Sequence, residues 1–490
     1  MKSLVRFSIA LALTLVLVPA AFATNGMEAT ASGARAAGMG GVDIAIATDA
    51  TAMNTNPAGL TQLLGHRIDF GTALLIPIVH FKNDLNDKDG VVNIFPMPMI
   101  AYGYRFQNVP IALGLGVFTQ GGMGAEFKLD HAIAGQDADY FSTLGYMKLA
   151  PTIAYQPHEM VSLGGAFNLG WAQMGMKMPF AVHPSIMTGR AMRGGSEVSF
   201  GSLFENMLGY DELTAMAELE NANAFGFGGK LGILITPHEV VSLGLAYTFQ
   251  TTLTFHGDAK MDMQGQFDDA LPKMVDAFQL MPSVDTPQQA EQAVMEFFQE
   301  NGVDPERGYA ANYDAEVEFA WPRKLAFGVA VRPLEQLLMG VDVTWINWSA
   351  TMEKFKMTLS NGDNDNINKM IGGDKVVAEI PLKWEDQLVF AFGTQYEFLP
   401  GAFARVGYNY GKNPVPDDTV FAVFPAIVEH HITLGGGYNV KDFFEVNAAY
   451  EYAVSNTQTA SSDHQIAAEY DNSESTLGEH LAHVMFSFAF

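Results

Sequence analysis

Residues 427–455 read IVEHHITLGGGYNVKDFFEVNAAYEYAVS. Apolar and aromatic side chains occupy every second position from Ile432 to Val440, except at Gly436, and again from Phe444 to Tyr452, and the positions between them are small or polar. Successive side chains of a β-strand point to opposite faces, so each run predicts a strand with one apolar face. Only a short turn at Lys441-Asp442 separates the two runs. A soluble β-sandwich and a transmembrane barrel both contain such strands.

The connections between the strands distinguish these two folds. The same alternation predicts about fourteen strands, near residues 66–82, 91–106, 109–127, 142–156, 160–178, 223–236, 240–257, 318–332, 336–358, 379–398, 401–412, 427–440, 443–455 and 479–490. Short turns alternate strictly with longer loops, of which 179–222 and 258–317 are the longest. Turns on one side and long loops on the other are typical of outer-membrane barrels with an even number of strands. We therefore predict an all-β fold, an antiparallel transmembrane β-barrel of about fourteen strands.

Both ends of the chain carry targeting features. Residues 1–23 combine Lys2 and Arg6 with an apolar run and a final Ala21-Phe22-Ala23, which predicts a cleaved secretory signal peptide. A membrane anchor is the alternative, but the apolar run is too short to cross a bilayer. The last strand ends in Phe490 and resembles the signal that the barrel-assembly machinery recognises. The protein is expected in the outer membrane of a Gram-negative bacterium, among lipid and lipopolysaccharide.

The composition excludes several function classes. The 490 residues are 48% hydrophobic but only 17% charged, and their net charge of −27 disfavours nucleic acid as a partner. The chain has 0 Cys, which excludes disulfides, thiolate metal sites and cysteine catalysis.

Other catalytic and metal-binding patterns are weak. The histidines lack HExxH spacing, and the loop at 361–366 resembles a calcium loop without its glycine and terminal Glu. The sequence therefore predicts no catalytic residue, no metal site and no cofactor, and the protein is not expected to be an enzyme.

The segment before the first strand does not alternate. Residues 24–64 are rich in Gly and Ala and contain Gly38-Met39-Gly40-Gly41, Asp49-Ala50 and Asn56-Pro57-Ala58-Gly59-Leu60. The lumen of a barrel of about fourteen strands is too wide for its own side chains to fill. We therefore predict that this segment plugs the lumen; a flexible N-terminal linker is the alternative.

These motifs resemble the N-terminal hatch of the FadL family, outer-membrane transporters of long-chain fatty acids and, in a toluene-uptake branch, of aromatic hydrocarbons. The resemblance continues through Ile111–Phe118, Asp342–Ser349, Arg405–Tyr408 and Asn413–Asp417. It implies a hatch at 24–64, a barrel at 65–490 and transport of hydrophobic small molecules, with long-chain fatty acids as the leading expectation. A general diffusion porin or a surface-binding barrel is the alternative.

The resemblance also implies a route in three steps. A ligand is captured in an apolar groove on the two longest loops, where helical spacing selects Phe200, Phe204, Met207, Leu208, Met274 and Phe278. It then binds above the hatch and leaves sideways through a kink in the third strand, expected at Gly121, Gly122 and Gly124 near Asn56, Pro57 and Ala58. The alternatives are that the loop helices pack on one another as a lid, and that the third strand simply ends early.

Candidate groups for the polar end of the ligand are basic. Alternation places Arg405 on the lumen face, where its guanidinium can pair with a carboxylate or neutralise Glu429 or Glu445. The resemblance adds Lys354 and Lys356. In the fifth strand this chain has Gln173 or Met174 where the fatty-acid branch has a basic residue, which leaves neutral hydrocarbons open as ligands.

Overall fold

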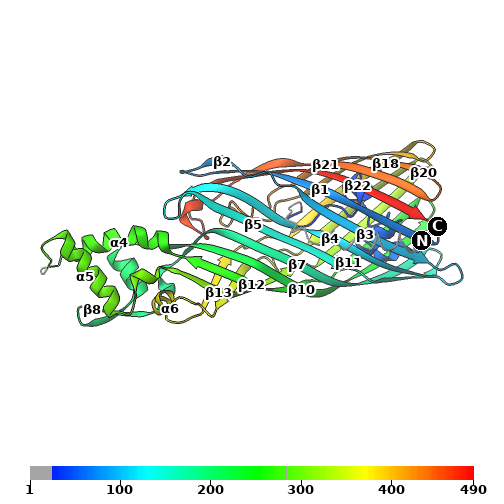
Figure 1. Ribbon diagram of the computed structural model, residues 1–490. Helices are drawn as coiled ribbons and strands as arrows, with labels where there is room; N and C mark the ends of the chain where they lie inside the picture. Colours follow the sequence, from blue (N-terminus) through cyan, green and yellow to red (C-terminus); the bar gives the residue numbers. More distant parts are fainter. Residues whose placement is uncertain (1–24, 282–283) are drawn as a thin grey trace, which may run out of the picture.

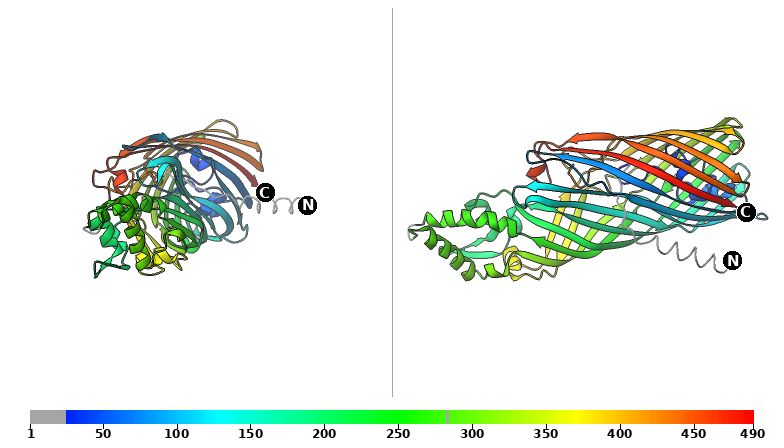
Figure 2. Two further views of the ribbon diagram at one scale, coloured as in Figure 1. Left: turned by 60° about the vertical axis from the view of Figure 1, so that its left-hand side comes forward. Right: turned by 45° about the horizontal axis from the view of Figure 1, so that its top comes forward.

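The strands form a closed ring in the computed structural model, which describes residues 25–281 and 284–490 (Figures 1 and 2). The predicted signal peptide, residues 1–23, lies outside the described residues. The first strand β1 (His66–Lys82) pairs with the last strand β22 (Glu474–Ala489) along its whole length, from Arg67 opposite Ala489 to Lys82 opposite Glu474. This ladder closes a ring of 14 strands and confirms the predicted fold class.

The chain crosses the wall of the ring fourteen times. In several of these crossings two consecutive strands together make up the crossing. In chain order they are β1; β3 (Phe95–Arg105); β4 (Ile111–His131); β5 (Gly135–Leu149) with β6 (Thr152–His158); β7 (Val161–Val182); β10 (Leu213–His238); β11 (Val241–Thr248) with β12 (Thr251–Asp262); β13 (Ala310–Trp321) with β14 (Lys324–Leu334); β15 (Leu337–Ile346) with β16 (Lys354–Ser360); β17 (Val376–Pro381) with β18 (Gln387–Leu399); β19 (Ala402–Gly411); β20 (His430–Lys441); β21 (Phe444–Thr459); and β22. The short β2 (Asp87–Asp89) extends the sheet beside β1, and β8 (Arg190–Arg193) pairs with β9 (Ser196–Ser199) in a separate hairpin.

Alternation sorts the side chains between the two faces of the ring. Large apolar side chains point outward and are exposed, as at Phe225 (69%), Phe227 (67%) and Leu434 (59%). Around the N-terminal segment the inward positions carry small or polar residues, which leaves room for that segment inside the ring, whereas toward the long-loop end large apolar residues such as Tyr146 and Met174 point inward. Such an outward apolar band is the surface that a bilayer covers.

Several strands continue further toward the long-loop end than the sequence predicts. The excursions expected at 179–222 and 258–317 are shortened, because β7 runs to Val182, β10 begins at Leu213, β12 runs to Asp262 and β13 begins at Ala310. In these extensions the outward residues are mostly charged, for example Lys260 beside Asp262. The apolar alternation therefore ends before the strand does.

Helices gather beyond the long-loop end of the ring (Figure 1). They are α3 (Phe200–Ser202), continued by a π-helical turn at Leu203–Met207, α4 (Gln264–Gln279), α5 (Pro287–Glu300) and α6 (Asp365–Ile371). Within residues 25–281 and 284–490, no helix is both long and apolar enough to cross a membrane.

The N-terminal segment, residues 25–64, lies inside the ring (blue in Figure 2). It contains α2 (Ala34–Ala37) and 3₁₀ helices at Ala50–Met53 and Pro57–Gln62, and most of its side chains are buried. The close fit depends on glycine at Gly40, whose positive φ of 69° brings its backbone against that of Tyr408 in β19, where a Cβ atom would meet the Tyr408 nitrogen at 2.7 Å.

Candidate functional site

Buried polar contacts hold the body of the N-terminal segment against several strands. The Asp342 carboxylate in β15 accepts hydrogen bonds from the backbone N–H groups of Asp43 (2.7 Å) and Ile44 (2.9 Å). The Asn56 side chain donates to the Ile233 carbonyl in β10 (3.0 Å), and Lys230 donates to the carbonyl of Asn54. Since buried hydrogen bonds are costly to break, residues 42–58 are firmly attached to the wall.

An apolar cavity of about 40 Å³ lies within the ring toward the long-loop end. Its wall comes from β5, β7, β16, β17 and the inward-folded loop at 412–429, through Ser142, Thr143, Leu144, Met174, Gly175, Met176, Phe355, Ile380, Leu382, Phe421, Val423 and Phe424. Apolar lining with few polar groups is characteristic of a site for a hydrophobic small molecule. We call this space the upper cavity.

A line of aromatic rings leads inward from the upper cavity. Phe424 lies 5.8 Å from Trp384, measured between ring centroids, and Trp384 lies 5.3 Å from Trp348. Trp321 follows at 6.4 Å from Trp348, and Tyr146 at 4.7 Å from Trp321. The three tryptophans are buried and come from three different strand connections or ends. This aromatic row joins the upper cavity to the centre of the lumen.

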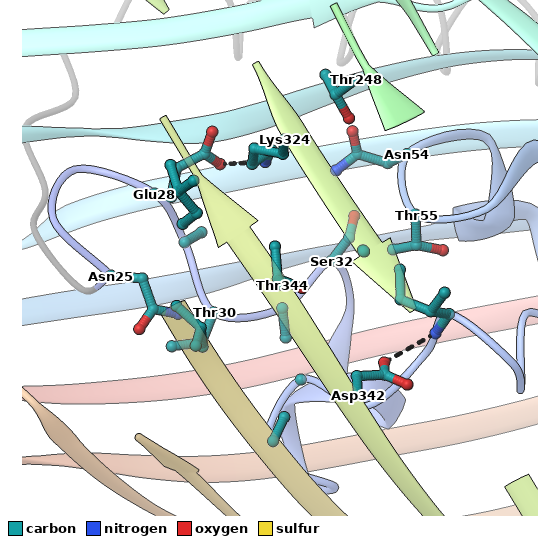
Figure 3. A pocket seen from close by; sticks show the side chains of 18 of the residues that line it. Asn25, Glu28, Thr30, Ser32, Asn54, Thr55, Thr248, Lys324, Asp342 and Thr344 are labelled. Atoms are coloured by element: carbon teal, nitrogen blue, oxygen red, sulfur yellow. Dashed lines mark hydrogen bonds and ion pairs between the residues drawn. The ribbon is translucent and has the colours of Figure 1, made fainter. Parts of the chain in front are cut away.

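At the inner end of the aromatic row the Glu28 carboxylate lies beside Lys324 (Figure 3), and two buried lysines lie nearby. The Lys324 Nζ lies 2.8 Å from Glu28 Oε2, and the Trp321 indole N–H donates to Glu28 Oε1. Lys148 and Lys230 are buried within electrostatic range of Glu28 and of Lys324. Lys148, Lys230 and Lys324 form the lysine cluster, which adjoins a polar cavity of about 120 Å³ lined by Lys230, Lys324 and Gln120.

The third crossing strand, β4, is kinked at the predicted glycines. Gly121 (φ 146°) and Gly122 (φ 157°) have backbone conformations that other residues rarely adopt, and the pairing register of β4 with β5 shifts between Thr119 and Gly121. A Cβ atom at Gly121 would meet the Met27 carbonyl oxygen at 2.1 Å. The kink therefore requires glycine and lies against residues 27–29.

Residues 27–29, and not the predicted Asn56, Pro57 and Ala58, lie against this kink. Asn56, Pro57 and Ala58 lie against Gly164 of β7 and Gly232 of β10, where a Cβ atom would meet Pro57, Ala58 or Asn56 at 2.1–2.3 Å. Glycines at those two positions allow the close approach, which a reading of β4 alone does not indicate. The kink instead receives residues 27–29, which we call the strap. The Ala29 N–H donates to the Gln120 carbonyl (2.9 Å) and the Gly122 N–H to the Met27 carbonyl (3.0 Å).

Next to the kink the ladder between β3 and β4 stops. Among the described residues these strands pair only from Met99 opposite Phe118 to Arg105 opposite Ala112. The Arg105 N–H donates to Gly65 on the β1 side, and the Phe106 N–H donates to Ile111 on the β4 side. The backbone N–H positions of the even-numbered residues in β3 therefore point toward β4. Pro96 and Pro98 occupy these positions and have no N–H to donate. We call this interruption the seam.

The predicted head-group residues are not brought together. Arg405 does face the lumen, but its guanidinium donates to Gln395 and Asn447 (both 2.7 Å) and lies 3.9 Å from Glu445. Its side chain packs under Gly38 of the N-terminal segment. This arrangement agrees with the alternative that Arg405 neutralises a lumenal carboxylate.

Lys354 and Lys356 do not enter the lumen. They lie on the outward face of β16, where Lys354 pairs with Glu379 (2.8 Å) and Lys356 with Glu318 (2.6 Å). Their strand neighbours Met357 and Leu359 point inward and are buried. Because side chains alternate along β16, the two lysines point away from the lumen, so the structure does not support them as head-group residues.

The predicted loop-groove residues mostly pack on one another. Phe200, Phe204, Met274 and Phe278 are buried, and only Met207 and Leu208 are partly exposed. The Phe204 and Phe267 rings meet edge to face at 5.5 Å, and those of Phe278 and Phe297 at 5.8 Å. In this structure the helices form a closed lid, which was the alternative interpretation of their spacing.

The mouth of the ring is covered by two inward-folded loops, 412–429 and 460–473. His464 in the second loop contacts the Val420 carbonyl of the first through Nε2 (2.9 Å), and burial lowers the pKa of His464. Glu469 accepts a hydrogen bond from the Tyr140 hydroxyl (2.5 Å) and lies 3.7 Å from His131. Burial raises the pKa of Glu469 to about 7.

Sequence reasoning missed the lysine cluster, Glu28 and the aromatic row. The alternation of β5 places Lys148 on the inward face with Leu144 and Tyr146, which is a signal for a lumenal cation. The tryptophans carry no such signal, because Trp348 and Trp384 lie just outside regular strands, where alternation does not apply.

Comparison with known proteins agrees with this architecture. The model of a family described as "Outer membrane protein transport protein (OMPP1/FadL/TodX)" matches residues 10–489. The structure is similar to the toluene transporter TodX of P. putida (TM-score 0.68, 16% identity, covering 94% of this chain and 99% of that one). It is also similar to a Pseudomonas aeruginosa FadL homologue (0.68, 14%, 95% and 100%) and to the Ralstonia pickettii toluene transporter TbuX (0.65, 17%, 94% and 99%). No curated protein matches the sequence directly.

Proposed function

Because this chain belongs to the OMPP1/FadL/TodX family of outer-membrane transport proteins, we propose that it carries hydrophobic small molecules, foremost long-chain fatty acids, across the outer membrane. Membership of this family confirms the prediction that the chain is a transport protein and not an enzyme. The observation that carries the proposal is the apolar upper cavity with the aromatic row leading inward from it to Tyr146, the residue that pairs with Gly121 at the β4 kink.

The route keeps the ligand out of water. Burying apolar surface is worth about 25 cal/mol per Å², so an alkyl chain favours contact with Phe424, Trp384 and Trp348 over an aqueous lumen. The loop lid is the proposed capture surface, with Met207 and Leu208 as its accessible part. The ligand enters the upper cavity when the lid and the mouth loops move.

The exit in this proposal is lateral. Residues 24–64 act as a hatch that blocks a straight path, and the body of the hatch is attached to the wall through Asp342 and Asn56. The seam beside β4 has few ladder hydrogen bonds to break and is covered from inside by the strap. Movement of the strap opens a path into the bilayer, where the ligand stays buried.

The proposal includes the biogenesis and surroundings expected from the sequence. Residues 1–23 are removed during export, the barrel-assembly machinery recognises the terminal strand through Phe490, and the outward apolar band lies among lipid and lipopolysaccharide.

Filling the upper cavity tests the route. Met174 lines the cavity and is buried, so Met174→Trp is expected to reduce the uptake of radiolabelled dodecanoate by about tenfold, whereas Met174→Leu keeps an apolar side chain of similar volume and retains uptake. Equal uptake by both variants would refute the route. A large, steady ion current through the reconstituted protein would instead favour the diffusion porin.

A further inference from the structure

Glu28 connects two parts of the molecule that are otherwise separate. Its carboxylate lies in the lysine cluster, where it pairs with Lys324 (Figure 3) and accepts a hydrogen bond from the Trp321 indole N–H. Its backbone belongs to the strap and forms an isolated antiparallel bridge with Gly121 at the β4 kink. Displacement of the Glu28 carboxylate from Lys324 would therefore act directly on the strap, which covers the seam.

The groups around the Glu28 carboxylate could bind the carboxylate of another molecule as well. They supply an ammonium group at 2.8 Å, an indole N–H donor and two further buried lysines, Lys148 and Lys230. The other carboxylate on the adjoining cavity, Asp342, accepts hydrogen bonds from two backbone N–H groups of the hatch. Charge-assisted hydrogen bonds of this kind are the strong ones, particularly where water is scarce.

The aromatic row ends at the same point. Trp321 both continues the row from Trp348 and donates its N–H to Glu28. An alkyl chain lying along the row would therefore bring a terminal carboxylate to Lys324. The site combines an apolar channel with a cationic end, which matches an amphiphilic acid better than a neutral hydrocarbon.

We propose that Glu28 is an internal substitute for the ligand's carboxylate: a long-chain carboxylate arriving along the aromatic row replaces Glu28 at Lys324 and Trp321, and the strap then leaves the β4 edge and uncovers the seam. This inference rests on the proposed function and adds ligand class and gating to it. The exchange conserves charge at the lysine cluster, because one carboxylate replaces another. The strap is the part of the hatch able to move, since residues 42–58 have their own attachments to the wall.

The test compares two ligands that differ only in the polar end, dodecanoate and dodecanol, with purified full-length protein. Glu28→Gln keeps the side-chain size but removes the competing charge, so dodecanoate affinity is expected to rise about tenfold while dodecanol affinity stays within about twofold. Lys324→Gln should lower dodecanoate affinity by about tenfold without changing that of dodecanol.

A matched control removes another contact of the same N-terminal segment. Glu451 accepts a hydrogen bond from the Thr30 hydroxyl (2.7 Å) but pairs with His483 and not with a lysine. Glu451→Gln should leave the ratio of the two affinities unchanged. As a second readout, a cysteine introduced as Ala29→Cys in this cysteine-free chain should react faster with a polar maleimide when dodecanoate is present, and not when dodecanol is present.

The outcomes separate this inference from the proposed function. If the wild type binds and imports both ligands but Glu28→Gln leaves their affinity ratio unchanged, the carboxylate exchange is overturned and the transport route stands. If Ala29→Cys reacts equally with and without dodecanoate, the release of the strap is overturned. If the wild type binds neither ligand, both the proposed function and this inference fail.

Discussion

Glu469 lies buried in the mouth of the ring, beside Tyr140 and His131. Burial raises its pKa to about 7, so between about pH 4.5 and 7 the unfolded chain loses this proton while the folded chain retains it. Its contribution to stability is complete below pH 4.5 and declines as the pH rises through 7. We expect the loop at 460–473 to open more readily at pH 8 than at pH 5.5 because of Glu469.

Hydrogen exchange, corrected for its intrinsic pH dependence, measures this opening. His464 in the same loop has a lowered pKa, so its contribution to the stability of the loop decreases as the pH falls, opposite to that of Glu469. Comparison with Glu469→Gln separates the effect of the Glu469 carboxyl from that of His464. The wild type should be less protected than Glu469→Gln at pH 8, and the difference should shrink as the pH falls toward 4.5. A difference that does not depend on pH would contradict the assignment.

Single residues also show what the alternation pattern of the sequence cannot predict. Alternation correctly placed Arg405 on the lumen face, but it gives no depth along the ring and no partners. Gln395 and Asn447 come from the neighbouring β18 and from β21, and two of the five N–H groups of the guanidinium already donate to them. The functional cations proposed instead, Lys230 and Lys324, become neighbours only through the pairing of distant strands around the ring.

At the scale of elements, β3 owes its seam to two prolines. Pro98→Val would restore an N–H that points toward β4, where the Thr119 hydroxyl already donates to the carbonyl of residue 98 (3.0 Å). The added ladder bond should narrow the seam, raise stability by about 1 kcal/mol and reduce dodecanoate uptake at least threefold. Denaturant unfolding and uptake assays measure the two effects.

Met97→Val is the matched control for this change. It places the same residue one position away, where the N–H points to β1 and the pairing with β4 is unaffected. Faster uptake by Pro98→Val than by the wild type would argue against a lateral exit at this seam.

The elements themselves were largely predictable, for a physical reason. A strand that faces lipid must carry apolar residues at every second position, and each of the fourteen predicted strands corresponds to a crossing of the ring. The extensions beyond the bilayer lack this constraint, so β10 begins at Leu213 and not near residue 223. The kink at Gly121 was found because glycine breaks the pattern, but the strap that fills it has no periodicity of its own.

At the scale of the whole molecule, the proposed gating makes transport a movement of the strap against the ring. Ala29 and Gln120 are neighbours across the bridge, with an N–H···O distance of 2.9 Å, and neighbouring antiparallel positions have Cα separations compatible with a disulfide. The double variant Ala29→Cys with Gln120→Cys should stop the uptake of dodecanoate when oxidised and recover it when reduced.

Each single cysteine variant controls for the substitutions, and the absence of native cysteine makes the new disulfide the only one available. Unchanged uptake by the oxidised double variant would mean that the strap does not gate the exit. Because the cross-link holds the strap whatever the ligand, this result is independent of the carboxylate exchange at Glu28.

The ladder between β1 and β22 imposes an order on how the molecule is made. The ring closes only when β22 pairs with β1, as at Ala489 opposite Arg67, so closure has to wait until the chain has been synthesised through β22. Residues 25–64 contact β7, β10, β15 and β19 from within, and they precede all these strands in the chain. This order makes residues 25–64 available while the sheet is still open, so the barrel can close around a segment that precedes its first strand.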